Sequence, residues 1–166
     1  MLLEVKALEV GYGGIRAVKG IDLQVDEGEL VCLIGANGAG KSTTLRAICG
    51  LLPARGGSVR YAGADTAASA VHELPRKGLV MVPEGRGIFA QLTVEENLAM
   101  GAFTRADGAI ARDLERQFET FPRLKERRTQ TARSVVLLPA PLAPIRQTSS
   151  PSRTSRSMPF TARIPP

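Results

Sequence analysis

Cysteine is scarce in this chain: only Cys32 and Cys49 occur among 166 residues. Two cysteines are too few for the disulfide framework of a small secreted domain, so we expect both to be buried thiols in a reducing compartment. No apolar run reaches the roughly 18 residues that a membrane-spanning helix requires. The N-terminal MLLEVKALEV contains acidic residues and no cleavage site, so we do not expect a signal peptide. A hydrophobic content of 43% predicts a folded domain instead.

Acidic residues are absent from one part of the chain. Residues 133–166 hold five arginines and no Asp or Glu, whereas residues 1–132 hold 17 basic and 16 acidic residues. The acid-free segment also contains seven of the 11 prolines, and only SVVLL at 134–138 is long enough for a strand. We therefore predict a globular domain over 1–132 and a basic, disordered Pro/Ser/Arg-rich tail over 133–166. The pI near 9.9 keeps a nucleic-acid or membrane-surface role open, although the tail lacks lysine and an amphipathic period.

Hydrophobic patterning predicts strands that alternate with helices. Residues 3–10 and 21–25 alternate apolar and polar side chains, as half-buried strands do. The continuous apolar runs 30–34 and 79–82 predict strands buried on both faces of a partly parallel sheet. Further expected elements are a strand at 58–61 and helices at 41–49, 66–74, 93–100 and 108–121, the last with Asp107 as N-cap and a stripe of Ile110, Leu114 and Phe118. This order predicts the α/β class with parallel pairing.

A glycine-rich loop joins the first apolar run to the first helix. Residues 35–42, GANGAGKS, fit the pattern G-x-x-x-x-G-K-[ST]. Glycines let backbone N–H groups wrap phosphate oxygens, and the helix that follows directs its positive end at the anion. Lys41 would reach the β- and γ-phosphates, Ser42 would offer its hydroxyl to Mg²⁺, and Thr43 would add a phosphate contact.

Around this loop the sequence resembles the ATP-binding subunits of ABC transporters, most closely the branched-chain amino acid importer type. The resemblance covers about residues 1–131 and rests on three stretches: LEVGYGGIRAVKGIDLQVDEGELVCLIGANGAGKSTTLRAICGLL, GLVMVPEGRGIFAQLTVEENLAMGA and FPRLKERR. It implies a P-loop NTPase fold of the ABC ATPase type. That fold has a mixed sheet of antiparallel N-terminal strands and a parallel core, which is incomplete here.

The resemblance also implies roles for individual residues. Tyr12 stands where an aromatic ring stacks on adenine, and Val18 stands beside the adenine or ribose. Glu84 occupies the position of a Mg²⁺-ligating glutamine, and an interpretation as a solvated loop carboxylate stays open. The cofactors implied are ATP and Mg²⁺. The nucleotide-binding set is Tyr12, Val18, Gly35, Asn37, Gly38, Ala39, Gly40, Lys41, Ser42 and Thr43, and the metal ligands are Ser42 and Glu84.

Several family features are missing after residue 131. The sequence contains no LSGGQ, and Pro139 and Ala140 stand where the resemblance would place two carboxylates. No residue is therefore assigned a catalytic role. The abrupt change in composition near residue 132 is typical of a truncated or frameshifted reading of an ABC ATPase gene.

The resemblance implies an ATP-binding subunit of an importer for branched-chain amino acids, which couples ATP binding and hydrolysis to transport. Its partners would be membrane permease subunits and a second ATPase subunit, with no nucleic acid, at the cytoplasmic face of the inner membrane. Residues 86–100 are a candidate docking surface for the membrane subunit. One alternative is a nucleotide-binding module without hydrolysis, and another is a different P-loop class such as a small nucleotide kinase.

Overall fold

A computed structural model describes residues 1–85, 87–134 and 155–159. The chain divides into two compact units, and the division falls between Met81 and Val82. Of the described residues, unit 1 comprises 1–81 and 155–159, and unit 2 comprises 82–85 and 87–134. This division differs from the predicted change of character at residue 132, which concerns composition and stays a prediction.

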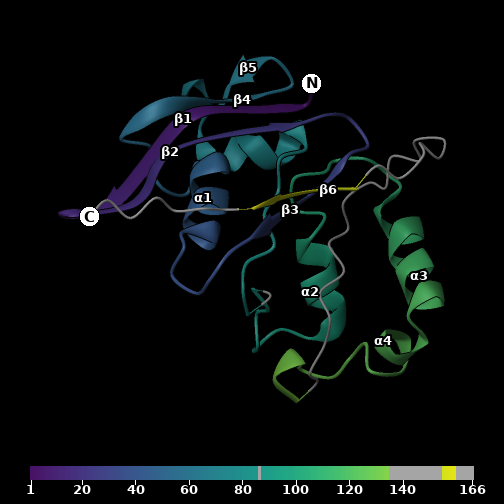
Figure 1. Ribbon diagram of the computed structural model, residues 1–166. Helices are drawn as coiled ribbons and strands as arrows, with labels where there is room; N and C mark the ends of the chain where they lie inside the picture. Colours follow the sequence, from purple (N-terminus) through teal and green to yellow (C-terminus); the bar gives the residue numbers. More distant parts are fainter. Residues whose placement is uncertain (86, 135–154, 160–166) are drawn as a thin grey trace. The chain divides into compact units, whose positions relative to one another are not determined.

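Unit 1 is built on a four-stranded antiparallel sheet. Its strands are β1 (Leu3–Tyr12), β2 (Ile15–Val25), β4 (Gly56–Tyr61) and β5 (Ala64–Asp65), in the order β2-β1-β4-β5 (Figure 1). The predicted N-terminal antiparallel strands are therefore confirmed. Alternation of apolar and polar residues directs one side of each strand to the core and the other to solvent.

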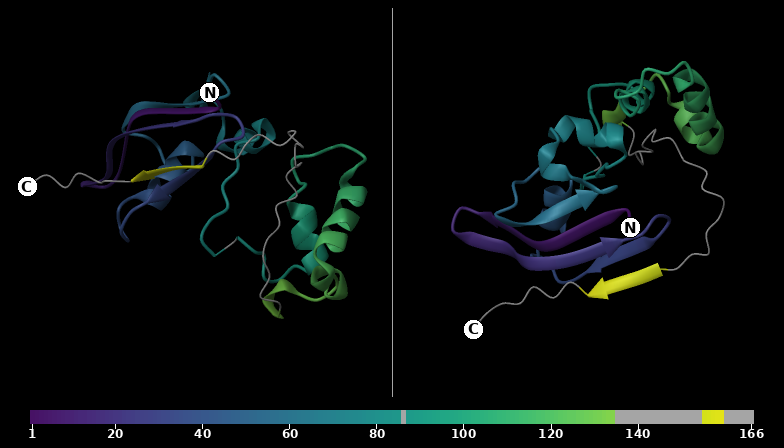
Figure 2. Two further views of the ribbon diagram at one scale, coloured as in Figure 1. Left: turned by 45° about the vertical axis from the view of Figure 1, so that its right-hand side comes forward. Right: turned by 90° about the horizontal axis from the view of Figure 1, so that it is seen from above.

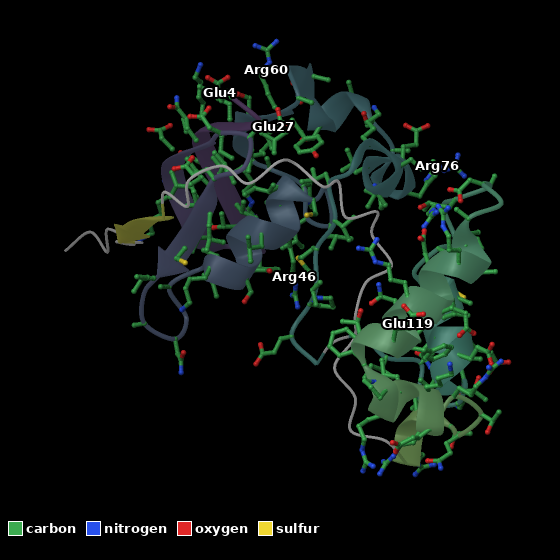
Figure 3. The ribbon with its side chains drawn as sticks, turned by 90° about the vertical axis from the view of Figure 1, so that its right-hand side faces the viewer. Glu4, Glu27, Arg46, Arg60, Arg76 and Glu119 are labelled. Atoms are coloured by element: carbon green, nitrogen blue, oxygen red, sulfur yellow. The ribbon has the colours of Figure 1, made fainter. Side chains whose placement is uncertain are left out.

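The core of unit 1 lies between this sheet and α1 (Lys41–Ile48), which runs beneath β1 and β2 in Figure 1. Ala47 and Ile48 of α1 pack against the apolar face of the sheet, whose buried residues are Val5, Leu8, Val10, Val18, Leu23 and Val59. On β1 and β4, Glu4 and Arg60 stand opposite each other in the strand register and both point away from α1 (Figure 3). Opposite charges at such a cross-strand pair favour this register.

A second, two-stranded sheet joins β3 (Leu30–Ile34) to β6 (Ser155–Pro159) in parallel (Figure 2). The parallel part of the predicted mixed sheet is thus this pair, separate from the antiparallel sheet. The prediction that β3 is buried on both faces is wrong: Leu30, Cys32 and Ile34 are exposed, and Val31 and Leu33 are half-buried. In the described part of the chain β6 is the one strand that pairs with β3, so the other edge of β3 is unpaired, and its face with Leu30, Cys32 and Ile34 is exposed. Cys32 is accordingly exposed rather than a buried thiol, while Cys49 is half-buried and its burial raises the pKa of its thiol.

Two other predicted elements differ from the structure. Residues 79–82 form no strand, because no described segment pairs with their backbone, and Val80 and Val82 are exposed. The predicted helix at 66–74 is two 3₁₀ segments, η1 (Thr66–Ala68) and η2 (Val71–Lys77). Pro75 lies inside η2 and does not end it, so the prediction that Pro75 stops this helix is wrong.

Unit 2 is helical. It contains α2 (Val94–Met100), α3 (Ile110–Thr120), α4 (Pro122–Glu126) and the 3₁₀ turn η3 (Ala132–Ser134). The predicted stripe is confirmed, because Phe118 is buried and Ile110 and Leu114 pack against the same cluster, whose members are Val94, Leu98, Ala102, Phe118 and Leu124. The N-cap of α3 is Ala109 and not Asp107, although the Asp107 carboxylate accepts the Ala109 N–H.

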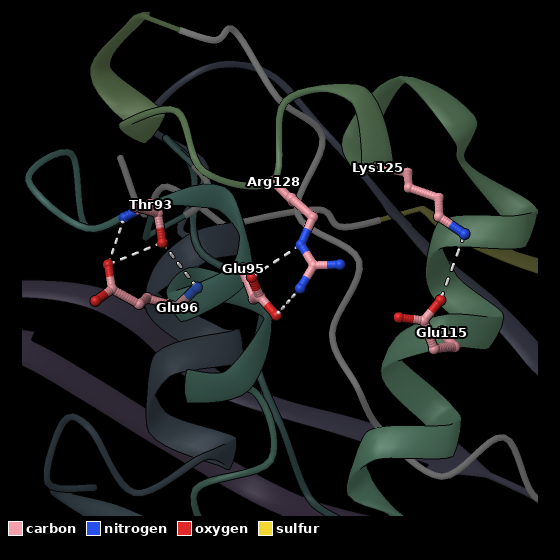
Figure 4. Close-up of polar contacts among 6 residues, drawn as sticks. All are labelled: Thr93, Glu95, Glu96, Glu115, Lys125 and Arg128. Atoms are coloured by element: carbon pink, nitrogen blue, oxygen red, sulfur yellow. Dashed lines mark hydrogen bonds and ion pairs between the residues drawn. The ribbon is translucent and has the colours of Figure 1, made fainter.

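Polar contacts hold the helices of unit 2 together (Figure 4). Arg128 makes a two-pronged ion pair with Glu95 of α2, with Nε and Nη2 at 3.1 and 3.0 Å from the carboxylate oxygens. Its guanidinium also lies 5.7 Å from the centroid of the Phe118 ring. Lys125 pairs with Glu115 at 3.5 Å. The basic residues after α4 are therefore not all solvated, because Arg128 ties this segment to α2 and α3.

Most of the predicted tail lies outside the described residues, including SVVLL apart from Ser134, and including residues 139 and 140. Within the described part, residues 155–159 form β6, a strand that the composition of the tail did not predict.

Candidate nucleotide-binding site

The glycine-rich loop occupies residues 35–40, between the end of β3 and the start of α1. Gly38 and Gly40 have left-handed backbones, with φ of 82° and 89°. A Cβ on Gly40 would lie 2.7 Å from the carbonyl oxygen of Ala17 and 3.3 Å from Cγ2 of Val18, so the loop backbone rests directly on β2. Nothing lies within 4 Å of a Cβ built on Gly38, so that position needs glycine for its backbone angle alone.

The side chain of Lys41 folds back over this loop. Its Nζ donates hydrogen bonds to the carbonyl oxygens of Gly35 at 2.7 Å and Ala36 at 2.8 Å. Neutral carbonyls are weaker partners for an ammonium group than anionic oxygens are. The ammonium therefore lies within the loop, where phosphate oxygens would be stronger acceptors than the carbonyls that it now contacts.

The electrostatics at the start of α1 favour an anion. Its N-cap is Gly40, which offers no side-chain acceptor, and no acidic residue occupies the first turn. Residues 30–64 contain four basic residues and no acid. The positive end of the helix is thus not neutralised by side chains of its own first turn. Thr44 is turned inward, where its hydroxyl donates to the Gly40 carbonyl at 3.0 Å, and it is fully buried.

Tyr12 lies at the edge of the same loop. The chain reverses after β1, and the Tyr12 hydroxyl lies 3.5 Å from Oγ1 of Thr43 in α1. The side chain is 45% exposed, which leaves ring surface free for a flat partner. The structure therefore brings together an aromatic ring, the phosphate-type loop and Thr43, as the sequence predicts for a nucleotide.

The remaining predicted loop residues occupy different surroundings. Asn37 and Ser42 are exposed, and the Ala39 N–H donates within the loop to the Ala36 carbonyl at 3.2 Å. Val18 is only 2% exposed and belongs to the core beneath Gly40, so its observed role is to support the loop. A contact between Val18 and a nucleotide stays a prediction.

Glu84 belongs to unit 2, in the turn 84–85, and its side chain is exposed. Among the described residues no group of three or more His, Cys, Asp or Glu side chains is placed to hold a metal. A Mg²⁺ site would thus depend on Ser42, water and phosphate oxygens, with Glu84 as a predicted further ligand.

Sequence reasoning missed the residues that support the loop and the turn beside Tyr12. Arg55 donates from Nη2 to the Gly13 carbonyl, and its backbone N–H donates to the Glu9 carbonyl at 2.7 Å, so it secures the turn beside Tyr12. The Ala17 carbonyl lies directly against Gly40, and the carbonyls of Gly35 and Ala36 accept hydrogen bonds from Lys41. No pattern in the sequence marks a backbone carbonyl, and an isolated arginine after a helix resembles any surface residue.

Comparisons with known proteins agree with this geometry. A family model described as ABC transporter matches residues 18–141. The high-affinity branched-chain amino acid transport ATP-binding protein BraG of Pseudomonas aeruginosa is 47% identical over 121 residues, which are 73% of this chain and 52% of that protein. The xylose import ATP-binding protein XylG of Shigella flexneri is 33% identical over 115 residues, which are 68% of this chain and 22% of that protein.

Solved structures show the same fold. The structure of an ATP-binding subunit of an ABC transporter matches with a TM-score of 0.68 and 35% identity, covering 79% of this chain and 54% of that one. A nucleotide-free ATP-binding cassette from an ABC transporter matches with a TM-score of 0.65. The chain thus spans about half the length of BraG and of these solved domains. No described helix is long and apolar enough to cross a bilayer.

Proposed function

This chain belongs to the ABC transporter family, and from that premise we propose that it is the ATP-binding subunit of an importer for branched-chain amino acids. The observation that carries the ATP-binding part is the phosphate-type loop, with Lys41 held inside it and α1 uncapped behind it. The amino acid specificity is supported by the 47% identity to BraG over 121 residues.

The chain's own residues divide the work of holding the nucleotide. Backbone N–H groups of Gly38, Ala39 and Gly40, together with Lys41, would bind the phosphates, and the Tyr12 ring would stack on the base. The Ser42 hydroxyl would ligate Mg²⁺, with Glu84 as the further ligand that the sequence predicts. When bound, the ion neutralises charge between the β- and γ-phosphates. Gly35 and Asn37 complete the loop. The Thr43 hydroxyl, which lies beside the Tyr12 hydroxyl, would donate a hydrogen bond to a phosphate.

The direct test is ATP binding by the purified chain with Lys41→Ala. Loss of charged hydrogen bonds worth about 1.5–3 kcal/mol should weaken ATP binding roughly 10- to 100-fold. Binding would be measured by calorimetry or with a fluorescent ATP analogue, in Mg²⁺ and in EDTA.

Lys77→Ala is the matched control for this test. Lys77 lies in the same unit, is exposed, and donates to Ser69 Oγ at 2.6 Å, away from the loop. It removes the same charge and should leave the ATP affinity unchanged. Equal losses in both variants, or none in Lys41→Ala, would contradict the proposed site.

The alternative of a module that binds nucleotide without hydrolysis has no support in the comparisons. The relatives are ATP-binding proteins of transport and import systems. ATP turnover by the purified chain, measured alongside binding, tests hydrolysis directly.

Unit 2 would provide the contact with the permease subunit, and thereby hold the chain at the cytoplasmic face of the inner membrane. Three apolar side chains near α2 are exposed: Phe89 at 52%, Met100 at 41% and Phe103 at 79%. Asn97 fixes the segment before α2, since it accepts the Phe89 N–H at 2.9 Å and donates to the Phe89 carbonyl at 3.0 Å. Exposed apolar residues on a fixed backbone are typical of a protein contact surface.

Phe103→Ser should therefore reduce co-purification with the permease subunits of a branched-chain amino acid importer. ATP affinity should stay unchanged, because Phe103 is not among the proposed nucleotide or Mg²⁺ contacts. Phe121→Ser, at an exposed apolar residue between α3 and α4, serves as the control. Association that is unaffected by Phe103→Ser would exclude this surface.

A further inference from the structure

Residues 133–166 correspond, residue by residue and in reverse order, to residues 13–46. Each residue at position n in this segment stands opposite the residue at position 179 − n. The correspondence is not one of similar side chains. It follows the genetic code, when the DNA strand opposite codons 13–46 is read one base out of phase with them.

In that phase the first two bases of an antisense codon are the complements of the second and first bases of the sense codon. A glycine codon, GGN, therefore specifies CCN, which is proline. The seven prolines of the segment stand opposite the seven glycines of residues 13–46: Pro139 and Gly40, Pro141 and Gly38, Pro144 and Gly35, Pro151 and Gly28, Pro159 and Gly20, Pro165 and Gly14, Pro166 and Gly13.

Other residue types obey the same rule. Alanine stands opposite alanine, threonine opposite valine, valine opposite threonine, and isoleucine or methionine opposite isoleucine. Leucine or phenylalanine stands opposite lysine and asparagine, whose codons begin with AA. In all, 32 of the 34 positions agree, and the two exceptions are Arg153 opposite Asp26 and Ser155 opposite Gln24.

Leucines provide an independent check on the third base. A CTN leucine codon specifies AG followed by the complement of the third base of the preceding sense codon, which gives arginine or serine. Leu23 and Leu33 follow Asp22 and Cys32, whose codons end in a pyrimidine, so arginine is required. Arg156 and Arg146 are found there.

Leu30 supplies the opposite case. It follows Glu29, whose codons end in a purine, so serine is required opposite Leu30, and Ser149 is found. The rule thus separates arginine from serine correctly at these three leucines, and at Leu45 either residue would agree because the Thr44 codon can end in any base. At ordinary residue usage each single agreement has a chance of roughly one in ten. The probability of 32 chance agreements in 34 positions is therefore far below about 10⁻²⁰.

We propose that residues 133–166 are the translation of an inverted copy of codons 13–46. The copy accounts for the composition of the segment. Codons of Asp22, Glu27 and Glu29 specify serine on the other strand, so acids disappear. Codons of Arg16 and Arg46 specify arginine again, and leucine codons add more. An inverted copy differs from a frameshift, because a frameshift would read the DNA downstream and not codons 13–46 again.

This origin changes the interpretation of two segments, β6 and the SVVLL run at 134–138. β6 stands opposite codons 20–24, which encode part of β2, and it pairs with β3, the strand that leads into the nucleotide loop. The SVVLL run, which the family match to residue 141 includes, arises opposite the codons of Lys41–Leu45. Neither segment is then a remnant of an ATPase strand, and the parallel partner of β3 is a product of copied β2 codons.

The test is the nucleotide sequence that encodes the chain, read from the source DNA without prior amplification. The amino acids constrain mainly the first two bases of each codon, so third bases are the informative positions. We expect the third base of each tail codon to complement the third base of the preceding sense codon at most of the 34 positions. Third bases that pair no more often than in unrelated DNA would overturn the proposal.

Discussion

At the residue scale, the nucleotide loop depends on two glycines for different reasons. Gly40 needs both a left-handed backbone and the absence of a side chain, because β2 lies directly against it. Gly38 has a similar backbone angle but open space around its Cα. The loop is therefore held against β2 at its helix end, whereas a side chain at Gly38 would meet no atom, which leaves this part of the loop accessible to phosphate.

Gly40→Ala and Gly38→Ala should consequently differ in stability. Both introduce a Cβ at positive φ, which costs about 1 kcal/mol. Gly40→Ala adds a Cβ 2.7 Å from the Ala17 carbonyl oxygen, so it should cost about 1–3 kcal/mol more than Gly38→Ala. Urea denaturation of the two variants measures the difference, and equal stabilities would show that the loop is not seated on β2.

At the element scale, α2 is a short helix that depends on its cap. Thr93 Oγ1 accepts the Glu96 N–H at 3.2 Å, and the Glu96 carboxylate accepts the Thr93 N–H at 2.7 Å. The Thr93 backbone N–H, followed by its hydroxyl, lowers the pKa of Glu96. Two otherwise unpaired donors are satisfied at the start of the helix that the sequence predicts over 93–100.

Thr93→Ala should destabilise unit 2 by about 1 kcal/mol at neutral pH, the usual cost of losing a threonine N-cap. Because the pKa of Glu96 is lower in the folded state, its charge stabilises the fold above the unfolded value near 4.3. That contribution is lost as the pH falls through the folded pKa.

The difference in free energy of unfolding between Thr93→Ala and the parent chain should therefore be smaller when urea unfolding is repeated at about pH 3. Thr120→Ala is the control, since its hydroxyl only donates to the Arg116 carbonyl within α3. It should cost less than about 0.5 kcal/mol at either pH. A stability difference between Thr93→Ala and the parent chain that does not change with pH would show that Glu96 does not contribute to the cap.

Local signals predicted most of the elements, and contacts distant in sequence explain the errors. The strands of the antiparallel sheet, α1, α2 and the Phe118 stripe follow from alternation, glycine placement and capping residues near one another in the chain. The burial of β3 and a strand at 79–82 could not be settled this way, because an apolar run does not name its partner strand. Arg55 and Arg128 were missed as structural residues because their side-chain hydrogen-bond partners lie 33 or more positions away.

At the scale of the whole molecule, charge is segregated by origin rather than by function. Of the formal net charge of +6, residues 1–132 carry +1 and residues 133–166 carry +5. If the latter segment comes from the opposite DNA strand, its arginines were not selected to face a partner. Clustered arginines still attract polyanions, through counterion release that does not depend on sequence.

Replacing all five arginines of residues 133–166 with glutamine tests this interpretation. The net charge falls from +6 to +1, and weak binding to duplex DNA at low salt should disappear, together with its dependence on salt concentration. ATP affinity should stay unchanged, because every proposed nucleotide contact lies within residues 12–84. Fluorescence anisotropy of labelled DNA across a salt series measures the first effect, and calorimetry with ATP measures the second. DNA binding that persists in the variant would place a nucleic-acid surface on the balanced body of the chain, where the sequence predicts none.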